Sequence, residues 1–108
     1  MTVNELCEKC GFSAVVVPDG DRDVTGCYMG DLLSWVMGRA KGDDAWITIM
    51  SNINIIAVAS LADVACIILS EGVTLDDDVI ATAQQKEINI LSSALPSYET
   101  AVKISEMI

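Results

Sequence analysis

Apolar and polar residues alternate in blocks along the chain, and each block has the length of one strand or one helix. Five short runs are apolar and rich in β-branched residues, as is typical of buried strands. These predicted strands cover residues 13–17, 24–29, 45–50, 64–69 and 87–91. Segments of helical length lie before, between and after them. The predicted helices cover residues 3–10, 31–40, 53–62, the segment that follows 74–78, and 96–107.

Capping residues mark where these helices begin and end. Thr2 with Glu5, and Thr74 with Asp77, have the spacing of a capping box. The acidic residues at 76–78 are stabilising next to the positive end of the helix that follows them. The remaining signals are Gly11 after the first helix, Asp31 before the second, Ser51 or Asn52 before the third, and Pro96 in the first turn of the last.

The strict alternation of strand and helix with short loops predicts the fold class. It is typical of α/β proteins with right-handed crossovers, in which helices cover a mostly parallel sheet. We therefore expect a three-layer domain, with four or five strands and helices on both faces. With 108 residues, the chain has the length of a single domain, 1–108.

Ligands of such sheets bind at the carboxyl ends of the strands. The segments predicted to lie there are 17–23, 50–52, 70–72 and 92–94. Ser51 and Asn52 follow their strand directly and are candidate binding residues, although helix capping alone would also account for them.

Charge and composition narrow the possible partners. Sixteen acids against six bases give a net charge of −10, which disfavours nucleic acids and anionic membranes. A small anion would need backbone N–H groups or the side chains of Arg22, Arg39 or Lys41. The start of the chain lacks the pattern of a signal peptide, and Ser51, Asn52 and Asn54 interrupt its longest uncharged stretch, so a cytoplasmic location is expected.

Several kinds of catalytic and metal site lack their residues. The chain has no histidine, no phosphate-binding glycine loop and no nucleophile–base pair, so we expect it not to be an enzyme. The acidic loop 19–23 fails the register of a calcium site at Val24 and Gly30. Cys7 and Cys10 lie inside a predicted helix and are interpreted as structural thiols, with a metal site that includes Cys27 as the alternative. No cofactor is predicted.

One segment is not explained by the core. Residues 21–34 read Asp-Arg-Asp-Val-Thr-Gly-Cys-Tyr-Met-Gly-Asp-Leu-Leu-Ser. This segment resembles the signature of the DRTGG domain family, a small bacterial and archaeal α/β module, except that Cys27 replaces the second glycine. Segments 45–49, 54–59, 65–69 and 90–92 also look like this family, so the resemblance extends over nearly the whole chain.

The resemblance implies a function as well as a fold. It suggests a regulatory module without chemistry of its own, which forms a homodimer and binds a small ligand, such as a nucleotide, or a protein partner. The alternative is an accessory subunit or remnant of an HPr-kinase-type enzyme that lacks the catalytic domain. The candidate binding residues are Asp21, Arg22, Thr25, Gly26, Tyr28, Gly30, Asp31, Ser51 and Asn52.

These candidates have two interpretations. In the functional one, Gly26 and Gly30 admit a ligand to the backbone, Arg22 meets an anion and Thr25 donates a hydrogen bond. Alternatively, Tyr28 and Met29 project into a partner subunit. In the structural one, the glycines adopt positive φ. Arg22 then pairs with an acid of its own segment, namely Asp21, Asp23 or Asp31, and Asp31 only caps its helix. The functional interpretation predicts that Arg22→Ala removes binding and leaves the melting temperature nearly unchanged.

Overall fold

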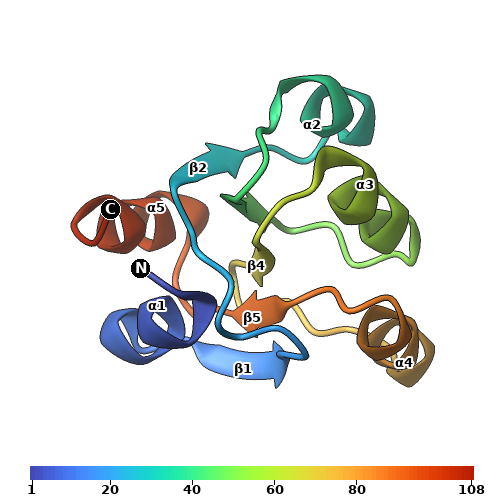
Figure 1. The fold of residues 1–108 in the computed structure, drawn as a ribbon, viewed down its shortest axis with the longest axis horizontal. Helices are drawn as coiled ribbons and strands as arrows, with labels where there is room; N and C mark the ends of the chain where they lie inside the picture. Colours follow the sequence, from blue (N-terminus) through green and yellow to red (C-terminus); the bar gives the residue numbers. More distant parts are fainter.

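The computed structural model describes residues 1–108 and contains a five-stranded sheet and five helices (Figure 1). The strands are β1 (Ser13–Val16), β2 (Gly26–Met29), β3 (Asp44–Thr48), β4 (Cys66–Leu69) and β5 (Ile90–Ser92). The helices are α1 (Val3–Cys10), α2 (Leu33–Arg39), α3 (Asn54–Ala62), α4 (Asp77–Gln85) and α5 (Ser97–Ser105). Every predicted element is present, with ends that differ by one to a few residues.

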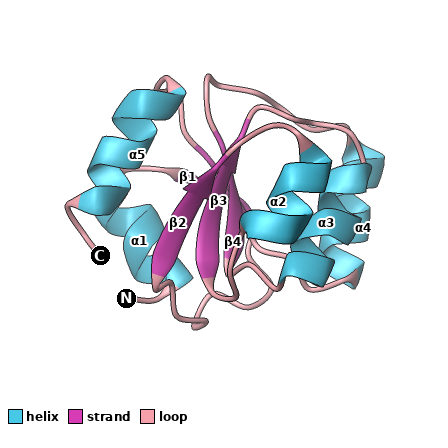
Figure 2. Ribbon diagram, turned by 90° about the horizontal axis from the view of Figure 1, so that it is seen from above, coloured by secondary structure: helices cyan, strands magenta, loops and turns pink.

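The sheet is mixed, with strand order β1-β5-β4-β3-β2. Strands β2, β3, β4 and β5 are parallel neighbours, and β1 pairs antiparallel with β5. Each crossover moves one strand in the same direction, so α2, α3 and α4 all lie on one face of the sheet. Figure 2 shows these three helices on one side and α1 with α5 on the other. The predicted three-layer α/β class is confirmed.

The core has two halves, one on each side of the sheet. Strands β3 and β4 are buried along their whole length, because helices cover both of their faces. Trp46 and Ile67 belong to the cluster beneath α2–α4, whereas Ile47 and Ile68 belong to the cluster beneath α1 and α5. No helix is long and apolar enough to cross a membrane.

The first capping box is confirmed and the second is wrong. The Thr2 hydroxyl accepts the Glu5 N–H, and the Glu5 carboxylate accepts the Thr2 N–H. Helix α4 instead has Asp76 at its N-cap, with no hydrogen bond from a capping side chain. The three consecutive acids at 76–78 suit the first turn of a helix in more than one register, and the helix begins two residues later than Thr74 would set.

The loop that follows β1 lies at the opposite edge of the sheet from the one predicted. Because β1 is antiparallel to β5, its carboxyl end meets the amino ends of the parallel strands. The Asn89 side chain, just before β5, fixes this loop through hydrogen bonds with both backbone groups of Asp19, at 2.9 and 2.8 Å. The acidic loop therefore lies beside the starts of β3 and β4.

Candidate functional site

The structure separates the predicted site residues into two groups. Thr25 lies at the amino edge of the sheet, where its N–H donates to the carbonyl of Asp43 just before β3. Asp31 lies at the carboxyl edge, where its carboxylate accepts the Thr48 hydroxyl at the end of β3. The amino-edge group is Asp21, Arg22, Thr25 and Gly26; the carboxyl-edge group is Gly30, Asp31, Ser51 and Asn52; Tyr28 lies between them on β2.

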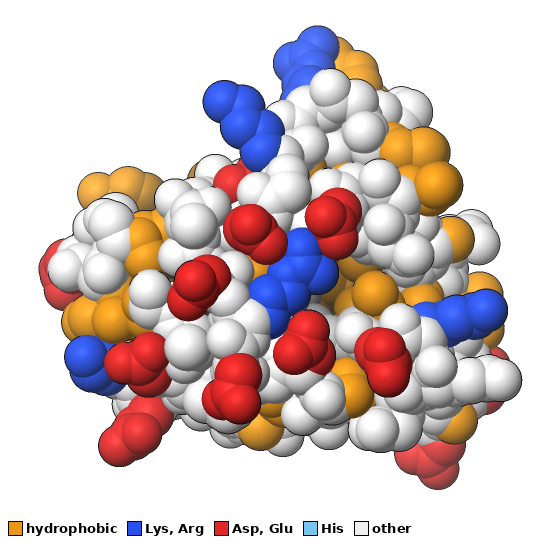
Figure 3. All heavy atoms as spheres, viewed as in Figure 1, with side chains coloured by type: hydrophobic (Ala, Val, Ile, Leu, Met, Phe, Trp, Pro, Cys, Tyr) orange, Lys and Arg blue, Asp and Glu red, His pale blue; other side chains and the backbone are white.

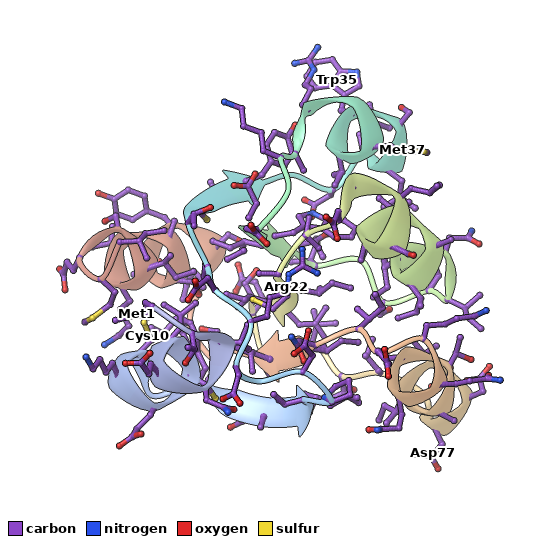
Figure 4. The ribbon with its side chains drawn as sticks, viewed as in Figure 1. Met1, Cys10, Arg22, Trp35, Met37 and Asp77 are labelled. Atoms are coloured by element: carbon purple, nitrogen blue, oxygen red, sulfur yellow. The ribbon has the colours of Figure 1, made fainter.

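Arg22 is the centre of an ion-pair cluster at the amino edge. Its Nε and Nη2 donate to Asp43 Oδ1 at 3.1 and 3.0 Å, and Nη2 also donates to Asp63 Oδ1 at 3.0 Å and to the Asp63 carbonyl at 2.6 Å. Figure 3 shows this cation encircled by carboxylates, and Figure 4 labels it at the centre of the same face. The predicted pairing within its own segment is wrong, because both partners come from turns far along the chain.

The two acids that bind Arg22 lie in turns of unusual backbone conformation. Asp43 and Asp63 have φ values of 67° and 58°, in the left-handed region that Asp tolerates better than most residues. Burial alone would lower the pKa of Arg22, but its hydrogen bonds with Asp43 and Asp63 outweigh that effect and raise the pKa. The arginine is thus charged, neutralised by neighbours and held in place.

Gly26, in the 21–34 segment, leaves space for the carboxylate of Asp44. Gly26 and Gly30 both have negative φ, so the positive-φ interpretation is wrong for both. A Cβ on Gly26 would lie 2.5 Å from Oδ1 of the buried Asp44. The other oxygen of that carboxylate accepts the Lys41 N–H at 2.8 Å. A side chain at position 26 would therefore displace the group that closes the turn before β3.

Tyr28 and Met29 lie differently along the same strand. Tyr28 is half-buried, and its ring packs against the core beneath α2–α4. A Cβ on Gly30 would lie 3.0 Å from Cε2 of that ring. Met29 is exposed. Of the two side chains predicted to meet a partner, Met29 is the one that projects from the molecule.

A polar cavity of about 380 Å³ borders strand β2, which is at one edge of the sheet. Its lining consists of Thr25, Gly26, Cys27, Tyr28, Arg39, Lys41, Gly42 and Asp44. Three of these were candidates from the sequence. The sequence indicates Arg39 and Lys41 as possible anion contacts but does not place them beside β2, because the end of α2 and the following turn approach this strand only in three dimensions.

Arg39 and Lys41 are the cations of this cavity, and neither forms an ion pair. The Arg39 guanidinium carbon lies 3.7 Å from the centroid of the Trp35 ring, a cation–π contact that orients it without neutralising it. Of the chain's six basic residues, these two stand beside β2 and are free to meet an anion.

At the carboxyl edge, polar side chains are bound to neighbouring backbone. Asp31 accepts the Thr48 hydroxyl at 2.8 Å and the Ile49 N–H at 3.0 Å, so it joins the end of β3 and does not cap α2 as predicted. The Asn52 side chain accepts the Asn54 N–H at 2.9 Å, but Ile53 is the N-cap of α3, so neither Ser51 nor Asn52 occupies the predicted N-cap position. Ser51 is exposed. No cavity is found around this group.

The cysteines are free thiols, and the structure places no three of its acidic or cysteine side chains where they could bind a metal ion. The side chains of Cys7, Cys10 and Cys27 thus do not form such a group in this structure. Cys27 is exposed when the whole residue is considered, but its sulfur is largely removed from water. This desolvation, and to a lesser extent the negative charge of Asp44, raises the pKa of the Cys27 thiol to about 11. The thiol in the cavity is neutral near pH 7 and a weak nucleophile.

The strand order and the covering helices define a three-layer α/β domain, and comparison with known proteins identifies its family. The DRTGG domain family matches residues 30–107, most of the chain, so the chain belongs to this family. The matched region begins at Gly30, so it includes the second part of the 21–34 segment but not Asp21–Gly26. A search of curated proteins found no match.

A solved structure shares the fold. It is the crystal structure of the CBS and DRTGG domains of the regulatory region of Clostridium perfringens pyrophosphatase, complexed with the activator diadenosine tetraphosphate. The TM-score is 0.74 at 14% sequence identity, over 95% of this chain and 45% of that chain. This chain therefore spans less than half of that regulatory region, and at this identity the likeness establishes the fold.

Proposed function

We propose that this protein is a regulatory module without catalysis of its own, and that it binds a small anionic ligand, such as a nucleotide, at the β2 cavity. The observation that carries the proposal is the pair of unpaired cations, Arg39 and Lys41, beside Thr25 and the edge strand. Family membership supports the regulatory role, since the DRTGG domain of the similar pyrophosphatase lies in a regulatory region that binds a nucleotide activator.

The charge of the chain makes the position of those cations informative. At a net charge of −10, the surface as a whole repels anions, so a phosphate group needs a local positive site. Arg22 is already neutralised by Asp43 and Asp63. Asp44 is the one carboxylate of the cavity, and it is buried and bound to the Lys41 N–H. A bidentate contact from Arg39 and a point charge from Lys41 suit a phosphate.

Calorimetric titration with ATP, diadenosine tetraphosphate and inorganic phosphate tests this proposal. We expect a nucleotide to bind, and to add about 2.7 kcal/mol of stability at about a hundred times its Kd. The double variant Arg39→Ala/Lys41→Ala should lose that binding. Lys9→Ala/Lys103→Ala, which removes two exposed lysines on α1 and α5, is the matched control and should keep it. Binding that survives in the double variant, or absence of binding by every compound, would refute the proposal.

We also propose that the chain forms a homodimer along the free edge of β2. The opposite edge strand, β1, has an irregular register between Ala14 and Val16, and Pro18 follows it, both of which discourage strand addition. Strand β2 has a regular register and no proline, and it carries the exposed Met29. Light scattering at micromolar concentration should give the mass of two chains, and Met29→Asp should lower it. A monomeric mass for the wild type would contradict this part of the proposal.

A further inference from the structure

The carboxylate of Asp44 is the one negative group among the residues that line the β2 cavity. The residue is 7% exposed, and its two oxygens have different surroundings. Oδ2 accepts the Lys41 N–H at 2.8 Å, whereas Oδ1 accepts no hydrogen bond. No side-chain polar atom that is sealed from solvent lacks a partner, so Oδ1 is open to the cavity. A buried acid thus presents a free hydrogen-bond acceptor to this space.

Gly26 is the reason that this oxygen is uncovered. It lies opposite Asp44 on the neighbouring strand, and a Cβ at position 26 would lie 2.5 Å from Oδ1. Any larger residue would fill the space in front of the carboxylate. The glycine of the 21–34 segment therefore keeps one oxygen of Asp44 accessible from the cavity.

A free carboxylate oxygen is unfavourable in a site for phosphate alone. An inorganic phosphate or polyphosphate carries negative charge on oxygens all around it, so some of them would lie near Asp44, and like charges repel more strongly in a partly buried site than in water. The same oxygen is favourable for a ligand that meets Arg39 and Lys41 with a phosphate group and Asp44 with a hydroxyl group. The cavity therefore suits a ligand that has both groups.

Aromatic rings at the cavity indicate what else the ligand carries. The chain has two Trp, two Tyr and one Phe, and two of these five rings are beside the cavity. Tyr28 lines it, and Trp35, which is 52% exposed, lies under the guanidinium of Arg39. Aromatic rings and arginine planes are the groups on which nucleobases stack. A hydroxyl group between a phosphate and a base is a ribose hydroxyl.

We infer that the β2 cavity selects a nucleoside phosphate over inorganic phosphates, and that Asp44 is the residue that sets this specificity by accepting a hydrogen bond from a ribose hydroxyl. The inference rests on the proposed anion site at Arg39 and Lys41. The bond to the hydroxyl offsets the repulsion between Asp44 and the phosphate. Gly26 gives the ribose access to the carboxylate.

Calorimetric titration of the wild-type protein with three compounds tests this specificity. ATP, 2′,3′-dideoxy-ATP and tripolyphosphate all carry a triphosphate chain, but the second lacks the ribose hydroxyls and the third lacks the nucleoside. The dideoxy compound should bind at least tenfold more weakly than ATP, because a hydrogen bond to a charged group is lost, and tripolyphosphate more weakly still. ATP and dideoxy-ATP affinities within threefold of each other would overturn the inference.

The variant Asp44→Asn assigns the preference to this residue. Its preference for ATP over the dideoxy compound should fall at least fivefold, and tripolyphosphate should bind more tightly than it does to the wild type, because the repelling charge is gone. A purely structural disturbance would weaken all three compounds and leave the preference intact, which would overturn the role of Asp44. If the variant does not fold, as circular dichroism would show, the three compounds on the wild type still decide.

Asp77→Asn is the matched control, because it removes the same charge from an exposed position on α4. Figure 4 shows Asp77 at the opposite end of the molecule from Trp35. This variant should keep the wild-type order of affinities, and a change equal to that in Asp44→Asn would overturn the inference.

The anion site and its specificity can fail separately. If the three compounds bind equally, and Arg39→Ala/Lys41→Ala abolishes the binding of all three, the anion site stands and the specificity is refuted. If none of the three compounds binds, both are refuted.

Discussion

Replacement of Arg22 by alanine should destabilise the protein, contrary to the expectation from the sequence. The side chain is 26% exposed and binds two acids and one carbonyl, in turns that precede β3 and β4. Its loss would leave Asp43 and Asp63 without their cation. It would also raise the net negative charge of a chain that already carries −10.

The size of the effect follows from these contacts. Each ion pair contributes about 0.5 kcal/mol, a value reduced for solvent screening because the carboxylates are 48% and 75% exposed. The hydrogen bond to the Asp63 carbonyl adds about 1 kcal/mol. The total is about 2 kcal/mol. With an unfolding entropy of ~2.1 cal/mol/K per residue, a chain of 108 residues should lose about 9 °C in Tm.

Urea denaturation and thermal melts of the wild type and four variants measure this loss. Lys103→Ala changes the net charge equally but removes an exposed lysine, so it is the control. Asp63→Asn keeps a residue type that tolerates positive φ and removes only the charge. Combined with Arg22→Ala, it completes a double-mutant cycle that isolates the Arg22–Asp63 pair.

A loss below about 0.5 kcal/mol in Arg22→Ala, indistinguishable from that in Lys103→Ala, would refute the structural role of the cluster. Arg22 would then be available to a ligand, as the functional interpretation of the sequence proposes. A large loss of stability together with unchanged nucleotide binding would show that Arg22 stabilises the fold, whereas binding depends on Arg39 and Lys41.

Two further predictions concern Gly26 and the Cys66 thiol. Gly26→Ala should cost about 1–3 kcal/mol in urea denaturation, because its Cβ meets the Asp44 carboxylate at 2.5 Å. Gly38→Ala, with nothing within 4 Å in helix α2, should instead gain up to about 1 kcal/mol, and an equal effect at both sites would contradict the explanation. Burial raises the pKa of Cys66 above its ordinary 9.0, so the folded state keeps a proton that the unfolded state loses. Stability should fall above pH 9.0, by about 1.4 kcal/mol per pH unit for this thiol, and Cys66→Ala should flatten that slope; an unchanged slope would show that other groups cause it.

Local signals in the sequence predicted the elements well. The pair Thr2 and Glu5 interacts within one helical turn, so four residues are enough to predict where α1 begins. The uninterrupted apolar runs of β3 and β4 likewise follow from burial on both faces. The second capping box failed because several acids near Thr74 offer alternative starts for the same helix.

What the sequence could not predict depends on distant pairing. The pattern of side chains along β1 is the same whether the neighbouring strand is parallel or antiparallel. The sequence therefore does not determine the direction of β1, or the end of the sheet at which the following loop lies. Arg22 meets acids 21 and 41 positions away, and its adjacent acids mislead a local interpretation. Arg39 and Lys41 line the cavity because helix α2 leads the chain back to β2, and this path is not evident from the sequence.

The antiparallel pairing of β1 with β5 also affects how the chain can fold during its synthesis. The Asp19–Asn89 hydrogen bonds that fix the loop after β1 join residues 70 positions apart. At ~5–20 residues per second, a ribosome needs roughly 4–14 s to cover that interval. Throughout it, β1 has no neighbouring strand, and α1 lacks its contact with α5. Strand β1 is thus made well before β5 but is ordered only after it, and a nascent chain stopped before β5 should leave α1 and β1 open to proteases.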